Sequence, residues 1–241
     1  MNTSRKQAAA GVTVEAVIFR QFVDDDLGCA SYLVGDEETH EAVVVDPAYA
    51  IKQYLAAAGQ EGVRIVRTLE THTHADHVSG HGRLALEHGV PVSIHPTAEA
   101  AYEHDPLEDG QEIVLGNVAL RVLHTPGHRP EHCCFAVVDR ARAEEPWVVL
   151  TGDSLFVGDA ARPDLAVEAV DGARELYASL QRLLELPDID HLDRVLGNET
   201  VELVDVHGLQ RLGLGSVEDI AAQLSDPDRA KTPARVLSLL A

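Results

Sequence analysis

Residues 71–77 read Thr71-His72-Thr73-His74-Ala75-Asp76-His77, which places three histidines and one carboxylate within seven positions. The stretch follows the largely apolar run Val63–Leu69, a pattern that is typical of a buried strand. Neutral imidazole nitrogens and ionised carboxylate oxygens are ligands that iron and zinc bind readily. A solvated loop is the competing interpretation, because histidine also titrates and caps without binding a metal. Three histidines and one aspartate within seven residues favour a metal site over a solvated loop.

Two later segments supply further ligands. Leu123-His124-Thr125-Pro126-Gly127-His128 follows the strand-like run Val118–Leu123, and its Pro-Gly pair predicts a tight turn that brings His128 back across the strand end. The segment Trp147–Asp153 is an apolar strand that ends on a glycine and then on Asp153. Taken singly, each signal is weak, since most turn-flanking histidines and strand-end aspartates are structural. In this order, together with residues 71–77, they predict a complete set of ligands.

Composition indicates a globular protein. With 241 residues, of which 45% are hydrophobic, the chain can bury one substantial core, and no Gly/Ser-rich or Pro-rich linker divides it. We therefore expect a single domain over residues 1–241. Residues 1–11 are predicted to be a flexible tail, and residues 216–241 a helical C-terminal appendage.

Charge and cysteine content limit the partners and the compartment. A formal charge of -21 opposes binding to nucleic acids and to anionic membranes. The chain has no run long enough to cross a bilayer and no signal-peptide pattern, so we expect a soluble, cytoplasmic protein. Three cysteines, including the adjacent pair Cys133-Cys134, favour reduced thiols over a disulfide framework. A homodimer is the usual state of soluble oligomers and is a possible assembly here.

Short apolar runs alternate with amphipathic ones along the chain. Strands are predicted at Val12–Phe19, Ala30–Val34, Ala42–Val45, Val63–Leu69, Val90–Ile94, Glu112–Leu115, Val118–Leu123, Cys134–Val138 and Trp147–Leu150. Helices are predicted at Ile51–Ala58, His81–His88, Thr97–Tyr102 and Gly172–Leu186. This order indicates an α/β (α+β) fold of two packed mixed β-sheets covered by helices, with strand-end loops along one edge. The predicted ligands lie in such loops.

The motifs and their order resemble a known family. The quoted motifs are His72-x-His74-x-Asp76-His77, Thr125-Pro126-Gly127-His128 and Thr151-Gly152-Asp153. Together they resemble the metallo-β-lactamase superfamily, whose αββα sandwich carries its metals at one edge of the sheets; the match spans roughly residues 14–186. Within it, the chain looks like the persulfide dioxygenase branch, on the segments Phe22–Val34, Val45-Asp46-Pro47, Leu155–Asp159 and Arg162-Pro163-Asp164.

The persulfide dioxygenase resemblance implies one Fe(II) per chain, held by His72, His128 and Asp153. Two imidazoles and one carboxylate on one face of iron leave positions open for a substrate sulfur and O₂. The implied reaction oxidises a low-molecular-weight thiol persulfide, such as glutathione persulfide, to sulfite and thiol. In that case His74, Asp76 and His77 act around the ligands and do not hold a metal.

Glyoxalase II is the nearest branch with another chemistry, and it implies a binuclear zinc thioester hydrolase. There His74 joins the first metal, Asp76 and His77 hold the second, and Asp153 bridges the two. Two zinc ions would activate a bridging hydroxide for attack on a thioester. The metal content separates the two alternatives.

The chain departs from the family pattern at the last ligand, a C-terminal histidine. His191 and His207 are its only candidates, and His207 is favoured because an apolar run precedes it and a glycine follows it. Loss of this ligand would harm a binuclear hydrolase more than a mononuclear oxygenase. The departure also leaves open a third alternative, a non-catalytic metal-binding protein on a decayed enzyme fold.

Arg162 and Asp76 are the predicted catalytic side chains. A guanidinium at Arg162 would suit an anionic thiol substrate, and the equally weighted alternative is a salt bridge with Asp159 or Asp164. Cys133 and Cys134 follow His128 closely and suggest persulfide carriers. Buried small hydrophobic residues are the better interpretation of that pair.

Overall fold

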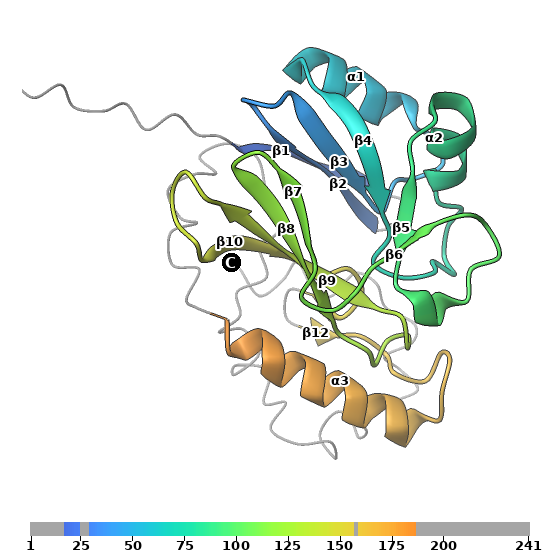
Figure 1. Ribbon diagram of the computed structural model, residues 1–241. Coiled ribbons are helices and arrows are strands. Elements are labelled where there is room, and N and C mark those ends of the chain that lie inside the picture. Colours follow the sequence, from blue (N-terminus) through green and yellow to red (C-terminus); the bar gives the residue numbers. More distant parts are fainter. Residues whose placement is uncertain (1–16, 25–28, 157–158, 187–241) are drawn as a thin grey trace, which may run out of the picture.

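The computed structural model describes residues 17–24, 29–156 and 159–186, and these build two packed β-sheets (Figure 1). The larger sheet contains, in spatial order, β1 (Val17–Asp24), β2 (Cys29–Asp36), β3 (Glu41–Val45), β4 (Arg64–Leu69), β5 (Val92–Ile94) and β6 (Asp105–Pro106). Its first three strands pair antiparallel and its last four pair parallel. The smaller sheet contains β10 (Pro146–Leu150), β9 (Cys133–Asp139), β8 (Val118–His124) and β7 (Glu112–Leu115), all antiparallel.

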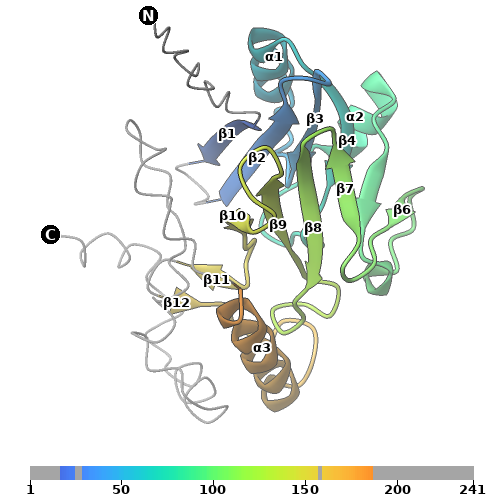
Figure 2. The same cartoon turned by 60° about the vertical axis from the view of Figure 1, so that its left-hand side comes forward.

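Helices cover the outer faces of both sheets. The helices α1 (Lys52–Glu61) and α2 (His81–His88) lie on the larger sheet, and α3 (Ala169–Leu184) lies against the smaller one (Figures 1 and 2). A short hairpin of β11 (Leu155–Phe156) and β12 (Asp159–Ala160) adjoins α3. The expected fold class, two sheets flanked by helices, is confirmed.

Side-chain alternation explains why the strands stack in layers. On β3, Val43 and Val45 face the core between the sheets, whereas Val44 faces the helical layer. On β9, Cys133 faces the inter-sheet core and Cys134 faces α3. Successive side chains of a strand point to opposite faces, so a strand that is covered on both sides must be apolar at nearly every position. This accounts for the continuous apolar runs in the sequence.

Strand direction brings the predicted ligand loops to one edge. Because β3 and β4 pair parallel, their carboxyl ends meet at the same edge of the larger sheet. In the smaller sheet β8 and β10 both run antiparallel to β9, so their carboxyl ends also share an edge. A hydrogen bond from the Cys133 amide to the Thr71 carbonyl oxygen, 2.8 Å long, joins the two edges. The loops after β4, β8 and β10 therefore meet.

Several sequence expectations differ from the structure. The helix expected at Thr97–Tyr102 is wrong: only a 3₁₀ turn, Pro96–Ala98, forms there. Glu99 adopts a left-handed conformation with φ 48° and donates its amide to Pro96, which ends the turn. The smaller sheet is antiparallel throughout its described strands and not mixed. The short strands β6, β11 and β12 were not predicted, because two residues carry no periodicity.

Some expectations lie outside the described residues. These are the tail at 1–11, the beginning of the strand expected at Val12–Phe19, the candidate ligands His191 and His207, and the appendage at 216–241. Within the described ranges no helix is long and apolar enough to cross a membrane. The three cysteines, all described, form no disulfide, and Cys133 and Cys134 are fully buried as expected. Burial raises the pKa of the Cys134 thiol to about 12.

The turn before His128 packs against α3 so closely that it requires glycine. Gly127 has φ +138°, and a Cβ built there would lie 2.4 Å from Leu176 Cα. Gly127→Ala should therefore lower the free energy of unfolding by roughly 1–3 kcal/mol, the usual cost of overpacking. Gly59→Ala on α1 is the matched control, since its Cβ would meet nothing within 4 Å. Urea denaturation measures both, and equal stability of the two variants would contradict this packing.

Candidate metal centre

Three side chains from the three loops converge at the shared edge. His72 Nε2 lies 3.8 Å from Asp153 Oδ2, and His128 Nε2 lies 3.6 Å from the same oxygen. The two imidazole rings are 5.0 Å apart between centroids and nearly perpendicular, at 88°. Two ligands that each bind one ion at roughly 2.0–2.2 Å lie roughly 3–4 Å from each other. We call His72, His128 and Asp153 the triad.

The tautomer of His72 follows from its hydrogen bonds. The Thr71 hydroxyl donates its only proton to Asp46 Oδ2 at 2.8 Å. The 2.9 Å contact between Thr71 Oγ1 and His72 Nδ1 therefore requires the imidazole N–H to be the donor. His72 Nε2 keeps its lone pair, and that lone pair is available on the side of Asp153. Such hydrogen bonds fix the orientation and basicity of metal-binding histidines.

His128 is fixed in the same sense by a main-chain group. Its Nδ1 lies 3.3 Å from the carbonyl oxygen of Arg162, which can only accept a hydrogen bond. His128 Nε2 is then unprotonated where it approaches Asp153. Both imidazoles thus direct a lone pair toward one carboxylate, as a metal site requires.

The main chain around Asp153 is held by a buried histidine. His132 is fully buried, and its Nε2 accepts a hydrogen bond from the Asp153 amide at 3.2 Å. Gly152, which precedes Asp153, has φ +48°, and a Cβ there would lie 2.8 Å from both His132 Nε2 and Thr71 Oγ1. Only glycine allows the chain to pass between these two side chains. The Asp153 side chain itself remains 38% exposed, so the triad opens to solvent on this side.

Burial sets the charge states of the triad. It lowers the pKa of His72 far below its ordinary value, and the neighbouring rings of His74 and His132 add to that effect. Burial also lowers the pKa of His128, against the opposing charge of Asp153. The same burial raises the pKa of Asp153, and His128 and His74 oppose the rise. The imidazoles are therefore neutral, which is the form that binds metals.

His74 belongs to a different set of contacts. Its Nε2 lies 3.2 Å from Asp46 Oδ1 and 3.5 Å from Glu70 Oε2, and both carboxylates are at most 5% exposed. Burial alone would lower the pKa of His74, but the two carboxylates outweigh it and raise the pKa to about 9. The same Glu70 accepts a hydrogen bond from Ser79 Oγ at 2.8 Å. His74 thus serves as the counter-charge of two buried acids.

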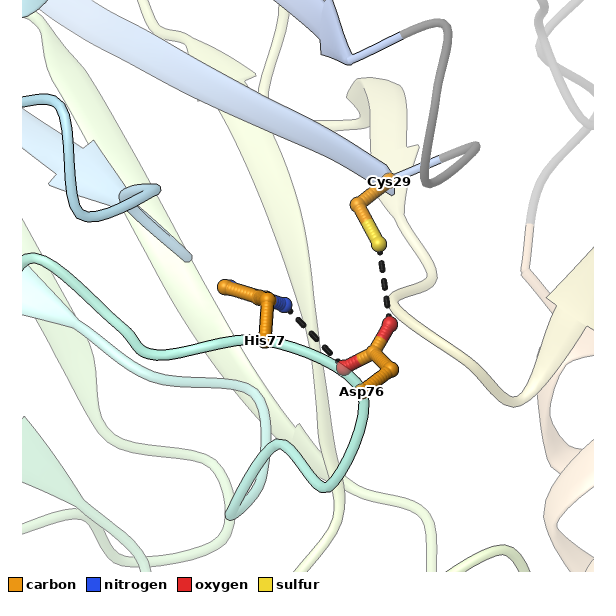
Figure 3. A group of neighbouring side chains, drawn as sticks. All are labelled: Cys29, Asp76 and His77. Carbon is orange, nitrogen blue, oxygen red and sulfur yellow. Dashed lines mark hydrogen bonds and ion pairs between the residues drawn. The ribbon is translucent and has the colours of Figure 1, made fainter.

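Asp76 and His77 also meet within the loop after β4. His77 Nδ1 lies 3.0 Å from Asp76 Oδ1, and Cys29 Sγ lies 2.9 Å from Asp76 Oδ2 (Figure 3). Burial would raise the pKa of Asp76, but the hydrogen bonds from Cys29 and His77 hold it below its usual range. The His77 ring lies 4.4 Å from the His74 ring, and the His74 ring lies 4.2 Å from the His72 ring, centroid to centroid. This group therefore adjoins the triad.

Arg162 contacts the triad through its backbone. Its guanidinium makes paired hydrogen bonds of 2.7 and 2.9 Å to Asp164, the salt bridge weighed against the substrate-binding role. Its carbonyl oxygen, by contrast, fixes His128. The structure therefore assigns the guanidinium to Asp164 and the main chain to the site.

The structure brings together some of the predicted residues and adds others. His72, His128 and Asp153 form one group, Asp76 and His77 a second, and His74 joins Asp46 and Glu70 in a third. Asp46, Thr71 and His132 were not assigned a role from the sequence. Asp46 had one usable signal, an aspartate before proline at the end of an apolar strand. His132, beside an apolar strand, had none.

Comparison with known proteins gives the family. The family model described as the metallo-beta-lactamase superfamily matches residues 24–197, most of the chain. The fold and the clustered histidines and aspartates agree with that match. The chain therefore belongs to the metallo-β-lactamase superfamily.

Individual relatives include enzymes of two chemistries. The chain is 32% identical over 173 residues to the mitochondrial persulfide dioxygenase ETHE1 of Bos taurus, covering 71% of this chain and 65% of that protein. It is 32% identical over 160 residues to a hydroxyacylglutathione hydrolase of Synechococcus sp., covering 65% of this chain and 60% of that protein. The chain thus spans less than two thirds of the length of these two curated relatives. The crystal structure of ETHE1 from Myxococcus xanthus superposes with a TM-score of 0.72 at 26% identity, covering 90% of this chain and 92% of that one.

The role of the Thr71 hydroxyl in orienting His72 can be tested by metal binding, without an activity assay. Thr71→Val keeps the shape but removes the proton that reaches Asp46 and the acceptor for His72. We expect the affinity for a divalent metal ion, measured with Fe(II), to fall by roughly 10–100-fold, the usual cost of losing such an outer hydrogen bond. Thr71→Ser keeps the hydroxyl and should bind nearly as wild type. Anaerobic competition with a chromophoric chelator measures both affinities, and equal affinity of the two variants would refute the role of the hydroxyl.

Proposed function

We propose that this protein is a persulfide dioxygenase that uses one Fe(II) per chain, bound by His72, His128 and Asp153. The observation that carries the proposal is the convergence of two imidazole lone pairs on the Asp153 carboxylate. Two histidines and one carboxylate are the ligand set of non-haem Fe(II) oxygenases. The identity to relatives named persulfide dioxygenase supports the same chemistry.

The residues present fit such an ion. Both histidines have their Nδ1 occupied by a hydrogen bond and their Nε2 available. When bound there, iron supplies open coordination positions at which a persulfide sulfur and O₂ react. The side of the triad next to Asp153 is the exposed one, so substrates reach it from that direction.

The surrounding residues hold the triad and shape its charge. Thr71 and the Arg162 carbonyl fix the two imidazoles, and His132 fixes the main chain at Asp153. Asp76 stays ionised beside the triad, where its carboxylate can accept a hydrogen bond from a bound water or a substrate thiol. The Arg162 guanidinium is paired with Asp164, so we assign Arg162 a positioning role, in which its carbonyl oxygen orients His128.

The overall reaction balances without a further reductant. One persulfide R–S–SH, one O₂ and one water give the thiol R–SH, one sulfite and two protons. The terminal sulfur is oxidised, both atoms of O₂ are reduced, and the S–S bond is cleaved. Glutathione persulfide is the substrate to test first, since the Bos taurus relative is named a persulfide dioxygenase.

Oxygen consumption tests this function directly. The anaerobically Fe(II)-loaded protein should take up O₂ when glutathione persulfide is added and should release sulfite in equal amount. His72→Ala should lower the rate by at least about 100-fold, since losing a ligand costs more than losing an outer hydrogen bond. Replacing Cys133 and Cys134 by alanine should leave uptake in place, because both thiols are buried in the core. An oxygen electrode measures the O₂ consumed, and a sulfite assay measures the sulfite released.

A second candidate function is a binuclear zinc thioester hydrolase. It is favoured by the hydroxyacylglutathione hydrolase relative and by the closeness of Asp76 and His77 to the triad. This alternative predicts thiol release from an S-acylglutathione under nitrogen, with two zinc ions per chain. Iron-loaded protein that consumes no O₂ but hydrolyses the thioester when loaded with zinc would replace the dioxygenase proposal.

A further inference from the structure

One buried carboxylate contacts the residue that follows each histidine of the triad. Thr73 follows His72 in the loop after β4. Arg129 follows His128 in the loop after β8. The Oε1 atom of Glu131 accepts hydrogen bonds from the amide of Thr73, at 3.1 Å, and from its hydroxyl. The same oxygen accepts a hydrogen bond of 2.7 Å from Nε of Arg129. We call these three hydrogen bonds the Glu131 bridge.

The Glu131 bridge joins the two sheets beside the metal centre. The Cys133 amide, at the start of β9, already donates to the Thr71 carbonyl oxygen at 2.8 Å. Two residues further along each segment, in opposite chain directions, Thr73 donates to Glu131. His72 therefore lies between two neighbours that are both bonded to the segment leading into β9.

Glu131 is ionised although it is only 2% exposed. Burial would raise its pKa, but the hydrogen bonds from Thr73 and Arg129 hold that pKa below its usual range. A buried ion pair seldom gives more stability than well-packed apolar side chains, and its best-attested use is to fix one arrangement of the chain. The arrangement fixed here is that of the two segments that carry His72 and His128.

Glu131 also balances the charge beside the triad. Besides burial, which is the main cause, the positive charge of Arg129 lowers the pKa of both His72 and His128. The negative charge of Glu131 acts on His128 in the opposite direction. Without this carboxylate, Arg129 would leave an uncompensated positive charge near a site for a cation, and like charges repel.

We propose that Glu131 is a positioning residue of the metal centre: without contacting the ion, it holds His72 and His128 at the spacing that one ion requires. The two rings are 5.0 Å apart between centroids and nearly perpendicular. The proposal rests on the triad binding a metal ion, as the proposed function does, but not on the reaction that follows. Loss of the carboxylate should therefore weaken metal binding even where the chain still folds.

Co²⁺ binding to the metal-free full-length chain tests this role, because the visible absorption of bound Co²⁺ reports both affinity and ligand geometry. The part of the signal that His72→Ala removes belongs to the triad. Glu131→Ala should weaken Co²⁺ binding there by about tenfold or more, the cost of losing an outer partner, and should change the spectrum of the bound ion. Glu131→Gln keeps an acceptor for Thr73 but loses the charge, so its affinity should lie between those of Glu131→Ala and wild type.

Asp36→Ala is the matched control. Asp36 is also a buried carboxylate that joins the two sheets, since it accepts a hydrogen bond of 3.3 Å from the Asn117 amide. It pairs with Glu41, the first residue of β3, and Asn117 directly precedes β8, so this link lies at the edge opposite the triad. Asp36→Ala should lower the free energy of unfolding, measured in urea, and leave the Co²⁺ affinity unchanged.

Three results would overturn the role of Glu131. One is wild-type Co²⁺ affinity in Glu131→Ala with an unchanged circular dichroism spectrum. Another is an equal loss of affinity in Asp36→Ala, which would reduce the effect to stability. If Glu131→Ala does not fold, wild-type affinity in Glu131→Gln would overturn the role instead. A chain that binds Co²⁺ at the triad but consumes no O₂ when loaded with iron would refute only the oxygenase, and the comparison of variants would still decide the role of Glu131.

Discussion

The metal centre depends on one buried carboxylate, Asp46. It accepts hydrogen bonds from both the amide and the hydroxyl of Thr71, at 2.7 and 2.8 Å. The parallel pairing of β3 and β4 opposes Val45 to Leu69, and this register carries Asp46 and Thr71 past the strand ends together. Asp46 adopts a left-handed conformation with φ 49°, an uncommon state for a non-glycine residue that its contacts must stabilise. Through Thr71, that carboxylate orients His72.

The Thr71 backbone, held by Asp46, also positions the edge of the smaller sheet. The Thr71 carbonyl accepts the Cys133 amide, which aligns the edge of the smaller sheet with that of the larger one. His132, next to Cys133, then holds the Asp153 amide, and Gly152 passes between His132 and Thr71. A buried acid is costly unless its partners are complete, so these contacts have to form together. Within the triad, Asp153 is the solvent-exposed end of an otherwise buried hydrogen-bond network.

The sequence predicted what depends on local pattern. The strand-end positions of His72, His128 and Asp153 could be read from apolar runs followed by turn residues, and the layered fold followed from the order of those runs. The roles of Asp46 and His132 could not, because each acts on a residue of another segment that only tertiary packing brings near. The helix expected at Thr97–Tyr102 does not form, because Glu99 adopts a left-handed backbone conformation that ends the turn. Arg162 was predicted as a catalytic side chain, whereas in the structure its carbonyl, and not its guanidinium, contacts His128.

The loop after β4 carries both His72 of the triad and the Asp76 carboxylate near it. The triad offers nitrogen and oxygen ligands, and its two imidazoles are oriented by Thr71 and by the Arg162 carbonyl. Asp76 accepts hydrogen bonds from Cys29 and His77, and its charge acts on Asp153 of the triad. The central claim, that one iron is held by His72, His128 and Asp153, is tested most directly by anomalous diffraction at the iron edge from anaerobically Fe(II)-loaded crystals. The account predicts a single iron peak between the two Nε2 atoms and the Asp153 carboxylate; two equal iron peaks bridged by Asp153, or a peak elsewhere, would contradict it.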